Sequence, residues 1–344
     1  MRNSKRRPLM ALPLVFALAI AACGGDDDDA SSETIAEDSP LAETEATDPP
    51  AAETTEAPAP EATDPPQATD PPAAETTEAP APETTEAAPE FDLAAAVDEY
   101  ASTIPEGWMS VGDLAAFKEV MEAADPVLID VREESEYAEG FIMDAVNIPI
   151  RTLGQNLDKI PTDQQVIVYC KSGWRAGMAV SSLAMAGYDN VKAFGGGWNA
   201  WTEAEEEIST EAVEAEVFGD PGLQPEMVAA VDGFLSTIPD GYYTAGDAAA
   251  VSDAIDAGAF MLDVREPVEY AEGHIPGAEN APVRTLGSTD VDIPDDTSVI
   301  VYCKSGYRAS LSVPILHVLG HDNVKGFSGS WLAWTDAGLP TETP

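Results

Sequence analysis

The sequence of 344 residues contains few cysteines and few histidines. It has three residues of each type, and no cysteine lies in a C-x-x-C pair or near histidines at metal-ligand spacing. We therefore expect no metal site. The cysteines also lie in separate sequence contexts, which argues against a disulfide framework. Each cysteine needs its own explanation.

Basic residues are scarce as well, with 16 Lys and Arg against 63 Asp and Glu and a formal net charge of −47. This excess of acid repels phosphates, so we expect no nucleic-acid partner. Residues 24–92 contain no Lys or Arg and little that is apolar enough to offset the entropy of ordering them. They are rich in Pro, Glu and Thr and repeat TDPPAAETTEAPAPE from Thr47 and from Thr69, which predicts a disordered acidic stalk.

The N-terminus has the pattern of a secretion signal. Basic residues between Arg2 and Arg7 precede an apolar run, residues 9–22, that is short for a membrane span of about 20 residues. The small residues before Cys23 resemble the bacterial lipobox, in which lipid is attached to the cysteine. That resemblance implies a lipoprotein signal in residues 1–23, lipidation of Cys23, and an extracytoplasmic protein that is lipid-anchored to a bacterial membrane.

The rest of the chain contains one pattern twice. From Asp130 to Trp201 the second copy follows at a constant offset of 133 residues, so no net insertion separates the shared motifs. We therefore predict two domains, at residues 93–207 and 226–340, joined by a linker at residues 208–225.

Each copy alternates short apolar runs with helical patterns. Such alternation predicts an α/β fold, in which a mostly parallel sheet is flanked by helices. In the first copy we expect strands at residues 127–130, 166–169 and 191–194, and helices at 113–124, 134–138 and 176–186. In the second copy we expect strands at residues 260–263, 299–302 and 324–327.

A six-residue loop that occurs in both copies carries the strongest chemical signal. It is Cys170-Lys171-Ser172-Gly173-Trp174-Arg175 in the first copy and Cys303-Lys304-Ser305-Gly306-Tyr307-Arg308 in the second. Each cysteine ends a predicted strand and precedes a predicted helix, the usual ligand position of an open α/β sheet. Backbone amides of the turn, the helix dipole and the nearby Lys and Arg favour a negatively charged sulfur there. We therefore expect two nucleophilic thiolates.

Four ordered motifs resemble those of rhodanese-like sulfurtransferases. The loop C-K-S-G-x-R-A/S is similar to the active-site loop of that family. Segments beginning at Asp130 and Asp263 resemble its D-V-R-x-x-x-E-Y pattern, and residues 273–278 match its G-H-I-P-G-A. The segments ending at Trp201 and Trp334 resemble its terminal G-G-x-x-x-W. The resemblance covers nearly all of both copies and implies two tandem rhodanese-like domains.

The resemblance also implies a reaction through cysteine persulfide. Sulfane sulfur would pass from a small donor such as thiosulfate to the catalytic cysteine, Cys170 or Cys303, and then to a thiol or cyanide acceptor, with no metal or organic cofactor. By position, Lys171, Arg175, Lys304 and Arg308 would bind the donor's charge, Ser172, Gly173, Ser305 and Gly306 would supply backbone amides, and Trp174 and Tyr307 would shape the pocket mouth.

The two copies differ in the segment that contains His274. There the second copy has H-I-P-G from residue 274, whereas the first has F-I-M-D from residue 141. We therefore expect the Cys303 site to be the more active one, and we interpret His274 as a structural residue at the border of the pocket.

Two further local expectations concern charge and proline. We expect ion pairs between Arg132 and Glu136 and between Arg265 and Glu269, because their spacing lets them meet across one turn. We expect Pro314 to kink the helix that follows the second loop or to cost it about 3 kcal/mol.

Two other functions are compatible with the same loop. Cysteine phosphatases and arsenate reductases also surround an oxyanion with a cysteine and an arginine, but their C-x5-R spacing is longer than that from Cys170 to Arg175. A sulfane-sulfur carrier or redox-sensing protein that holds a persulfide without turnover would need the same thiolate. The sequence leaves open the natural donor and acceptor, the packing of the domains and the oligomeric state.

Overall fold

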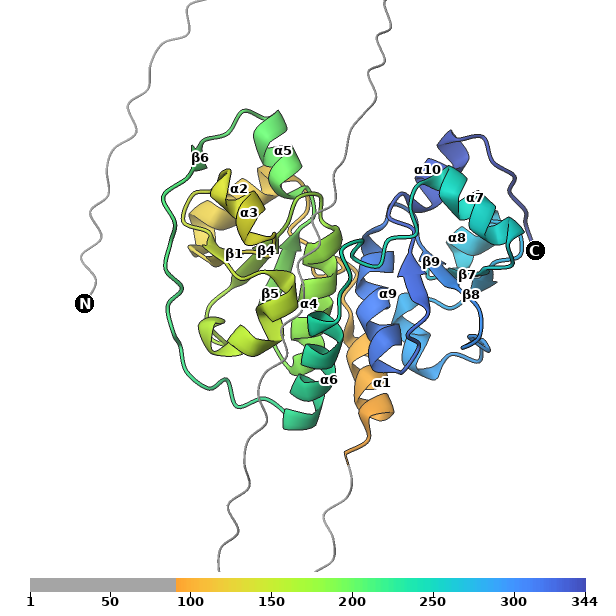
Figure 1. The fold of residues 1–344 in the computed structure, drawn as a ribbon, viewed down its shortest axis with the longest axis horizontal. Helices are drawn as coiled ribbons and strands as arrows, with labels where there is room; N and C mark the ends of the chain where they lie inside the picture. Colours follow the sequence, from red (N-terminus) through yellow and green to blue (C-terminus); the bar gives the residue numbers. More distant parts are fainter. Residues whose placement is uncertain (1–90) are drawn as a thin grey trace, which may run out of the picture. The chain divides into compact units, whose positions relative to one another are not determined.

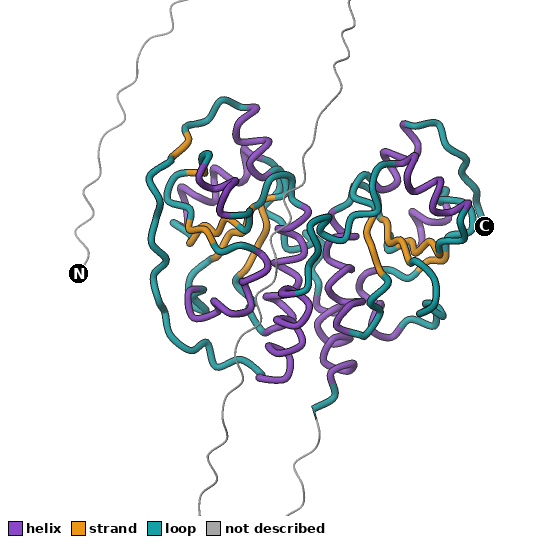
Figure 2. Tube along the Cα trace, viewed as in Figure 1, coloured by secondary structure: helices purple, strands orange, loops and turns teal. Residues whose placement is uncertain are grey.

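The computed structural model describes residues 91–344 (Figure 1). The predicted signal, the lipidation site Cys23 and residues 24–90 of the predicted stalk lie outside the described residues. The described chain forms two α/β halves, and in each half helices flank the strands (Figure 2). None of the helices within residues 91–344 has the length and apolar character needed to cross a membrane.

Each half contains a four-stranded sheet in which all strands are parallel. The first sheet consists of β1 Val127–Asp130, β3 Val146–Asn147, β4 Val166–Tyr169 and β5 Val191–Phe194, in the order β3-β1-β4-β5. The second consists of β7 Phe260–Asp263, β8 Glu279–Asn280, β9 Val299–Tyr302 and β10 Val324–Gly326, in the matching order β8-β7-β9-β10. The fully buried central strands β4 and β9 explain the continuous apolar runs in the sequence.

The predicted fold class and strands are confirmed, and β10 ends one residue before the predicted end at residue 327. The pattern did not predict the two-residue strands β3 and β8, nor the antiparallel pair of β2 Phe141–Ile142 and β6 Ile208–Ser209. Two residues are too few to show a hydrophobic period.

Polar side chains before the helices explain where several of them begin. Asp113 accepts the N–H of Ala116 (3.0 Å) at the start of α2, and Asp247 accepts that of Ala250 (2.9 Å) at the start of α7. The helix α9, Tyr307–Val318, continues through Pro314.

The helices of the first half are α2 Leu114–Ala124, α3 Glu134–Ala138, α4 Trp174–Ala186 and α5 Gly197–Glu203. Those of the second are α7 Ala248–Asp256, α8 Pro267–Glu272, α9 Tyr307–Val318 and α10 Ser330–Asp336.

Two more helices are exchanged between the halves. α1 (Leu93–Thr103) precedes the first half but packs against the 3-10 helix η2 (Val283–Ser288) of the second. α6 (Pro225–Ser236) precedes the second half but packs against η1 (Ile150–Lys159) of the first (Figure 1). The predicted division at residues 93–207 and 226–340 therefore assigned each of these helices to the half that it does not cover.

Matched side-chain contacts hold the exchanged segments in place. Arg284 of η2 donates through Nε to the carbonyl oxygen of Ile104, which follows α1 (2.7 Å). Arg151 of η1 donates through Nε to the carbonyl oxygen of Ile238, shortly after α6 (2.7 Å). The same arginine in each copy therefore anchors the segment that comes from the other half.

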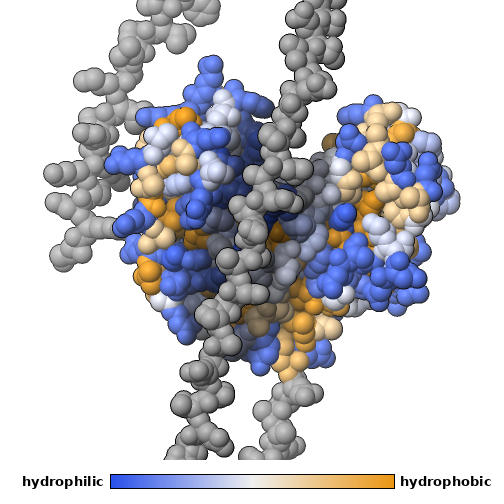
Figure 3. Space-filling model, in the orientation of Figure 1, coloured by the Kyte–Doolittle hydropathy of each residue, from blue (hydrophilic) through white to orange (hydrophobic). Residues whose placement is uncertain are grey.

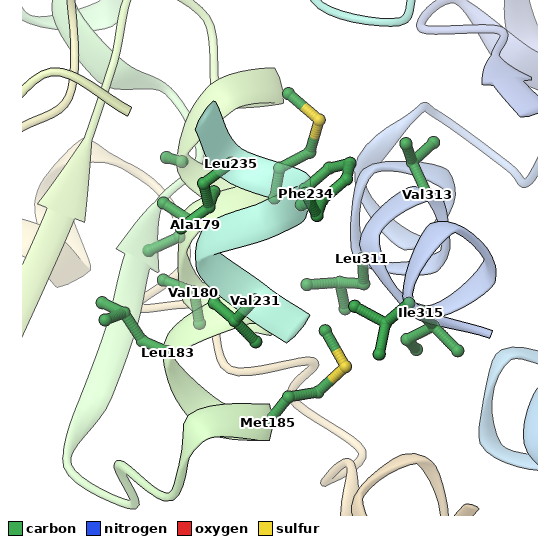
Figure 4. Close-up of a cluster of buried hydrophobic side chains, with 14 of the residues drawn as sticks. Ala179, Val180, Leu183, Met185, Val231, Phe234, Leu235, Leu311, Val313 and Ile315 are labelled. Carbon is green, nitrogen blue, oxygen red and sulfur yellow. The ribbon is translucent and has the colours of Figure 1, made fainter. Parts of the chain in front are cut away.

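One hydrophobic core continues through both halves. Buried side chains of α4, α6 and α9 belong to one cluster, among them Val180, Val231 and Leu311, which Figure 4 draws together. α4 and α9 approach so closely that a Cβ on Gly177 would overlap the hydroxyl of Ser310. The described chain is therefore packed as one body rather than as two independent domains.

A buried chain of hydrogen bonds crosses this core. The Tyr100 hydroxyl donates to Ser181 Oγ (2.9 Å), and Ser181 Oγ donates to the carbonyl oxygen of Leu311 (2.9 Å). These residues belong to α1, α4 and α9. Burial raises the pKa of Tyr100 far above its usual value, so this hydroxyl keeps its proton. The chain thus ties the first exchanged helix to both halves.

The predicted linker, residues 208–225, lies along the first half. Besides the pairing of β6 with β2, the N–H of Val213 donates to the Tyr137 hydroxyl (3.3 Å) and that of Phe218 to the carbonyl oxygen of Asp158 (2.7 Å). Among residues 91–344, the large hydrophobic residues that stay exposed are Met143, Ile208, Val213, Val217, Phe218, Val268 and Leu332. On the face drawn in Figure 3, hydrophobic residues are interspersed with hydrophilic ones.

Replacement of Gly287 by Ala should destabilise the protein. The added Cβ would lie 2.6 Å from the Cα of Asp98, so α1 and η2 would have to separate. Overpacking of this kind costs about 1–3 kcal/mol, which would appear as a lower midpoint of urea unfolding. Gly233→Ala is the matched control, because its Cβ would meet nothing within 4 Å and alanine favours the helix α6. Equal midpoints for the two variants would contradict the packing of α1 on η2.

Candidate active site

Each predicted nucleophile lies at the carboxyl end of a central parallel strand. Cys170 follows β4 and Cys303 follows β9, and each is only 1% exposed. The glycine before the following helix has a left-handed conformation in both loops, with φ of 91° at Gly173 and 100° at Gly306. A Cβ at either position would also overlap a carbonyl oxygen of the loop after β5 or β10. Only glycine therefore fits this turn.

The turn directs a backbone amide at each sulfur. The N–H of Gly173 donates to Cys170 Sγ (3.2 Å), and the N–H of Gly306 donates to Cys303 Sγ (3.2 Å). Both amides lie where a helix begins, so unpaired N–H groups and the helix dipole favour negative charge there. The amides of Ser172 and Ser305, which were also predicted as donors, make no hydrogen bond to sulfur within residues 91–344.

The arginine of each loop is paired with a glutamate from the short helix after the first strand. Arg175 donates to both carboxylate oxygens of Glu136 (2.5 and 2.8 Å), and Arg308 does the same with Glu269 (2.5 and 2.7 Å). The positive charges of the two loop arginines are therefore largely neutralised by carboxylates of the protein itself.

The electrostatic effects of these pairs agree with their geometry. Burial by itself would raise the pKa of Glu136, but the hydrogen bonds from Arg175 and the Glu133 N–H, together with the charges of Arg175 and Arg132, hold that pKa below its usual value. Hydrogen bonds from Arg308 likewise lower the pKa of Glu269. Burial disfavours the charged form of Arg175, yet its hydrogen bonds to Glu136 and its electrostatic interactions with Cys170 and Glu136 raise its pKa above the usual value. Arg175 thus remains charged beside the sulfur.

The ion pair predicted between Arg132 and Glu136 is wrong, as is its counterpart in the second copy. Arg132 instead donates to both carboxylate oxygens of Asp130, with distances from 2.6 to 3.0 Å. Asp130 is fully buried at the end of β1 and needs a charged partner there, whereas Glu136 is taken by Arg175. The D-V-R-x-x-x-E-Y motif therefore supplies one buried pair for the fold and one carboxylate for the cysteine loop.

The remaining predicted polar residues lie at the exposed tips of the loops. They are Lys171, Ser172, Lys304 and Ser305. Within residues 91–344, neither Lys171 nor Lys304 forms an ion pair. Both ammonium groups are thus available to an anion that arrives from solvent.

A loop from the second half completes the mouth of the Cys170 site. A cavity of about 520 Å³ contains Cys170 and is lined on its other side by residues 240–242, Thr244 and Ser328. The Tyr242 ring lies over the Arg175 guanidinium, 4.7 Å from ring centroid to Cζ. Its hydroxyl donates to Glu133 Oε1 (2.8 Å) and accepts from Arg175 (3.3 Å). The first site therefore requires the second half.

The exchange is reciprocal at the second site. The Trp108 ring lies over two guanidinium groups of the second half, 4.2 Å from that of Arg284 and 5.1 Å from that of Arg308. The segment before each domain thus places an aromatic ring over the loop arginine of the other domain. Trp108 and Tyr242 follow the exchanged helices α1 and α6, so the exchange delivers both rings.

Trp174 and Tyr307, which were predicted to shape the pocket mouth, lie between the two sites. Trp174 Nε1 donates to the carbonyl oxygen of Tyr242 (2.7 Å), and the Tyr307 hydroxyl donates to that of Met109 (3.3 Å). Both also line a cavity of about 590 Å³ that is bounded by residues 172–174 of the first loop and 305–307 of the second. The two cysteine loops thus face a common space.

Sequence reasoning missed Trp108 and Tyr242 as residues of the sites. The only available signal was their matching place in the repeat, after P-E-G at residues 105–107 and P-D-G at residues 239–241. The repeat marks them as equivalent, but it does not show that each reaches the other copy.

His274 has a structural place in the second half. Its ring stacks on Tyr270 with centroids 3.8 Å apart, and Nδ1 lies 3.1 Å from the carbonyl oxygen of Tyr270. Its backbone N–H and C=O both pair with Glu342. Among residues 91–344, no three His, Cys, Asp or Glu side chains are grouped so that they could hold a metal ion.

The fold and the two sites define a class of tandem α/β protein with a cysteine at the strand–helix turn of each half. The family model described as the rhodanese-like domain matches residues 113–204 and 247–337. The chain therefore belongs to the rhodanese-like domain family.

Individual relatives match half or more of this chain. A Haloferax volcanii protein named putative thiosulfate sulfurtransferase is 28% identical over 218 residues, which span 53% of this chain and 70% of that protein. Putative thiosulfate sulfurtransferase SseB of Mycobacterium tuberculosis is 34% identical over 191 residues, which span 50% of this chain and 64% of that protein. Among solved structures, the 3-mercaptopyruvate sulfotransferase SseA of Escherichia coli is 22% identical, with a TM-score of 0.31, over 62% of this chain and 96% of that one.

Replacement of Tyr242 by Ala should expose Cys170 selectively. The ring and its hydrogen bonds hold residues 238–244 over the first loop, and the loss of ~1.4 kcal/mol of such contacts raises the open population about tenfold. We expect alkylation of Cys170 by iodoacetamide to accelerate by about that factor. Cys303 in the same molecule is the internal reference.

Trp108→Ala is the converse variant and should accelerate alkylation of Cys303 only. Mass spectrometry of the two cysteine peptides measures both rates in one sample. An equal acceleration at both cysteines in either variant would show that the rings do not cover the sites separately.

Proposed function

We propose that this chain is a sulfurtransferase that moves sulfane sulfur from a small donor such as thiosulfate to cyanide or to a thiol acceptor. The observation that carries this proposal is that each loop cysteine sulfur receives a glycine N–H at 3.2 Å from the turn that opens a helix. Such a turn stabilises an anionic sulfur. Membership of the rhodanese-like family and the names of its relatives point to the same class of reaction.

In the proposed reaction, the thiolate of Cys170 or Cys303 attacks the outer sulfur of thiosulfate. A new S–S bond forms as the S–S bond of the donor breaks, and sulfite leaves with the bonding electron pair. Cyanide then attacks the outer sulfur of the persulfide, thiocyanate leaves, and the thiolate is restored. The two steps balance without an oxidant, a reductant, a metal or an organic cofactor.

The charges around each loop suggest how the donor is bound. The guanidinium groups of Arg175 and Arg308 are already neutralised by glutamates, so we assign the sulfonate end of the donor mainly to Lys171 and Lys304. Each arginine–glutamate pair has little net charge, so we assign the loop arginines to shaping the turn around the sulfur rather than to attracting the donor. This division of roles differs from one in which the loop arginine grips the donor directly.

Serine replacement of the two cysteines tests the proposal. Cys170→Ser and Cys303→Ser should each leave partial thiosulfate:cyanide activity, and the double variant should lose it by at least about a hundredfold because no nucleophile remains. We expect the larger loss from Cys303→Ser, since the second copy has the more complete motif. The measurement is thiocyanate formation, with persulfide mass shifts on each cysteine peptide as a second readout.

Other outcomes of this experiment have defined meanings. Full activity in the double variant would refute the sulfurtransferase proposal. Persulfide loading without thiocyanate turnover would instead indicate a sulfane-sulfur carrier. Cysteine-dependent hydrolysis of an aryl phosphate would indicate a phosphatase, although the loop is one residue shorter than C-x5-R.

We further propose that lipid on Cys23 anchors the protein on the extracytoplasmic side of a bacterial membrane. The support is the basic segment, the apolar run and the small residues that precede Cys23. When cells that express the wild-type chain are grown with an alkyne fatty acid, we expect the protein to carry the alkyne label and to remain in the membrane fraction.

Cys23→Ser should abolish that label, because the acceptor sulfur is gone, and Cys170→Ser is the control that should keep it. Undiminished labelling of the Cys23→Ser variant would rule out this anchor. The outcome does not depend on whether the protein transfers sulfur.

A further inference from the structure

Ser330 has an unusual backbone conformation beside the second cysteine. It is fully buried, with φ of 51°, in the left-handed region that side chains other than Gly, Asn and Asp rarely adopt. The matching residue of the first copy is Gly197, with φ of 54°. The backbone conformation at this position thus favours glycine, yet the second copy has a serine there.

Steric constraints at this position point in the same direction. A Cβ on Gly197 would overlap the carbonyl oxygen of Cys170, so a side chain is accommodated there only at a cost. The surrounding backbone is otherwise equivalent: the N–H of Trp198 donates to that carbonyl (2.8 Å), and the N–H of Trp331 donates to the carbonyl of Cys303 (3.0 Å). Packing therefore gives no reason for the serine.

The contacts of the Ser330 hydroxyl give a reason for the serine at this position. Its Oγ accepts the N–H of Cys303 (3.1 Å) and lies 2.7 Å from the carbonyl oxygen of Phe327 and 3.7 Å from Cys303 Sγ. A hydroxyl has one hydrogen, which can point to the carbonyl or, after rotation about the C–O bond, to the sulfur. The backbone N–H of Cys303 holds the oxygen in place in either case.

We propose that Ser330 is a positioning residue that donates its hydroxyl hydrogen to the anionic sulfur of Cys303, which makes the second site chemically distinct from the first. The Cys303 thiolate then has two donors, the Gly306 amide and this hydroxyl, whereas Cys170 has the Gly173 amide and no hydroxyl from Gly197. In the persulfide, whose existence rests on the function proposed above, the same hydroxyl stabilises the negative charge.

Two replacements separate the hydroxyl from the backbone strain. Ser330→Ala removes the hydroxyl but keeps a Cβ in the left-handed conformation, and Ser330→Gly removes both. If the hydroxyl acts on the sulfur, both variants lose the effect, although the glycine variant should be at least as stable as wild type. If the serine is only structural, the glycine variant should behave as wild type at Cys303.

The readout is the rate of alkylation of each cysteine by iodoacetamide between pH 4 and pH 10, followed by peptide mass spectrometry on the full chain. In both variants we expect the profile of Cys303 to move to higher pH by about one unit, which is the effect of one charge-assisted hydrogen bond. The profile of Cys170 in the same molecule should not move. Urea midpoints of the variants serve as the folding control.

Persulfide lifetime gives a second readout. After loading with thiosulfate, the fraction of Cys303 that carries one extra sulfur should decay faster in both variants, with Cys170 unchanged. Alkylation profiles of Cys303 that coincide with wild type in both variants would overturn the role of Ser330. Because alkylation needs no sulfur donor, this result is distinguishable from failure of the proposed function, which would appear as the absence of loading on either cysteine of the wild-type protein.

Discussion

Both cysteine sites depend on the exchange of α1 and α6 between the halves. Each exchanged helix packs on a 3-10 helix where glycine allows a close approach, at Gly154 and Gly287. The chain that leaves the helix then passes over the cysteine loop of the half that it has joined and places an aromatic ring on the loop arginine. Completion of each cysteine site therefore depends on the packing of the two halves, because each pocket contains residues from both.

The strongly acidic composition gives the local charges at each loop a particular importance. A formal charge of −47 repels an anionic donor at long range, but ions screen exposed charges beyond about 8 Å at physiological ionic strength. Within that distance an anion meets an exposed lysine and the amide end of a helix. The two parallel hydrogen bonds from each arginine to its glutamate fix the orientation of the guanidinium group.

The repeat also provides an internal comparison between two sites in the same frame. The amide on sulfur and the arginine–glutamate pair are the same in both. The differences are few: Tyr242 against Trp108 over the arginine, Trp174 against Tyr307 at the shared cavity, and Gly197 against Ser330 behind the sulfur. These changes alter side-chain contacts around two sulfurs that lie in equivalent backbone turns, so replacing single side chains can test how each affects the reactivity of its cysteine.

The sequence by itself determined the elements with a strong local signal. Buried strands such as Val166–Tyr169 show as continuous apolar runs, and the turn at Cys170 requires a glycine at Gly173, so strands and loops were predicted nearly to the residue. Spacing alone predicted the wrong partner for Arg132, which pairs with Asp130 instead of Glu136. Leaving the buried Asp130 carboxylate unpaired would cost more free energy than an ion pair at the surface contributes.

Only the tertiary structure decided which half each terminal helix covers. Both copies have the segment R-T-L-G on which the exchanged helices pack, at residues 151–154 and 284–287, so a local pattern cannot say whether α1 packs on its own copy or on the other. That choice is set by the length and direction of the connections and by the close packing of α4 on α9. The residues that depend on it, Trp108 and Tyr242 at the pocket mouths, were therefore beyond the reach of sequence reasoning, as was the place of the Ser330 hydroxyl beside the Cys303 sulfur.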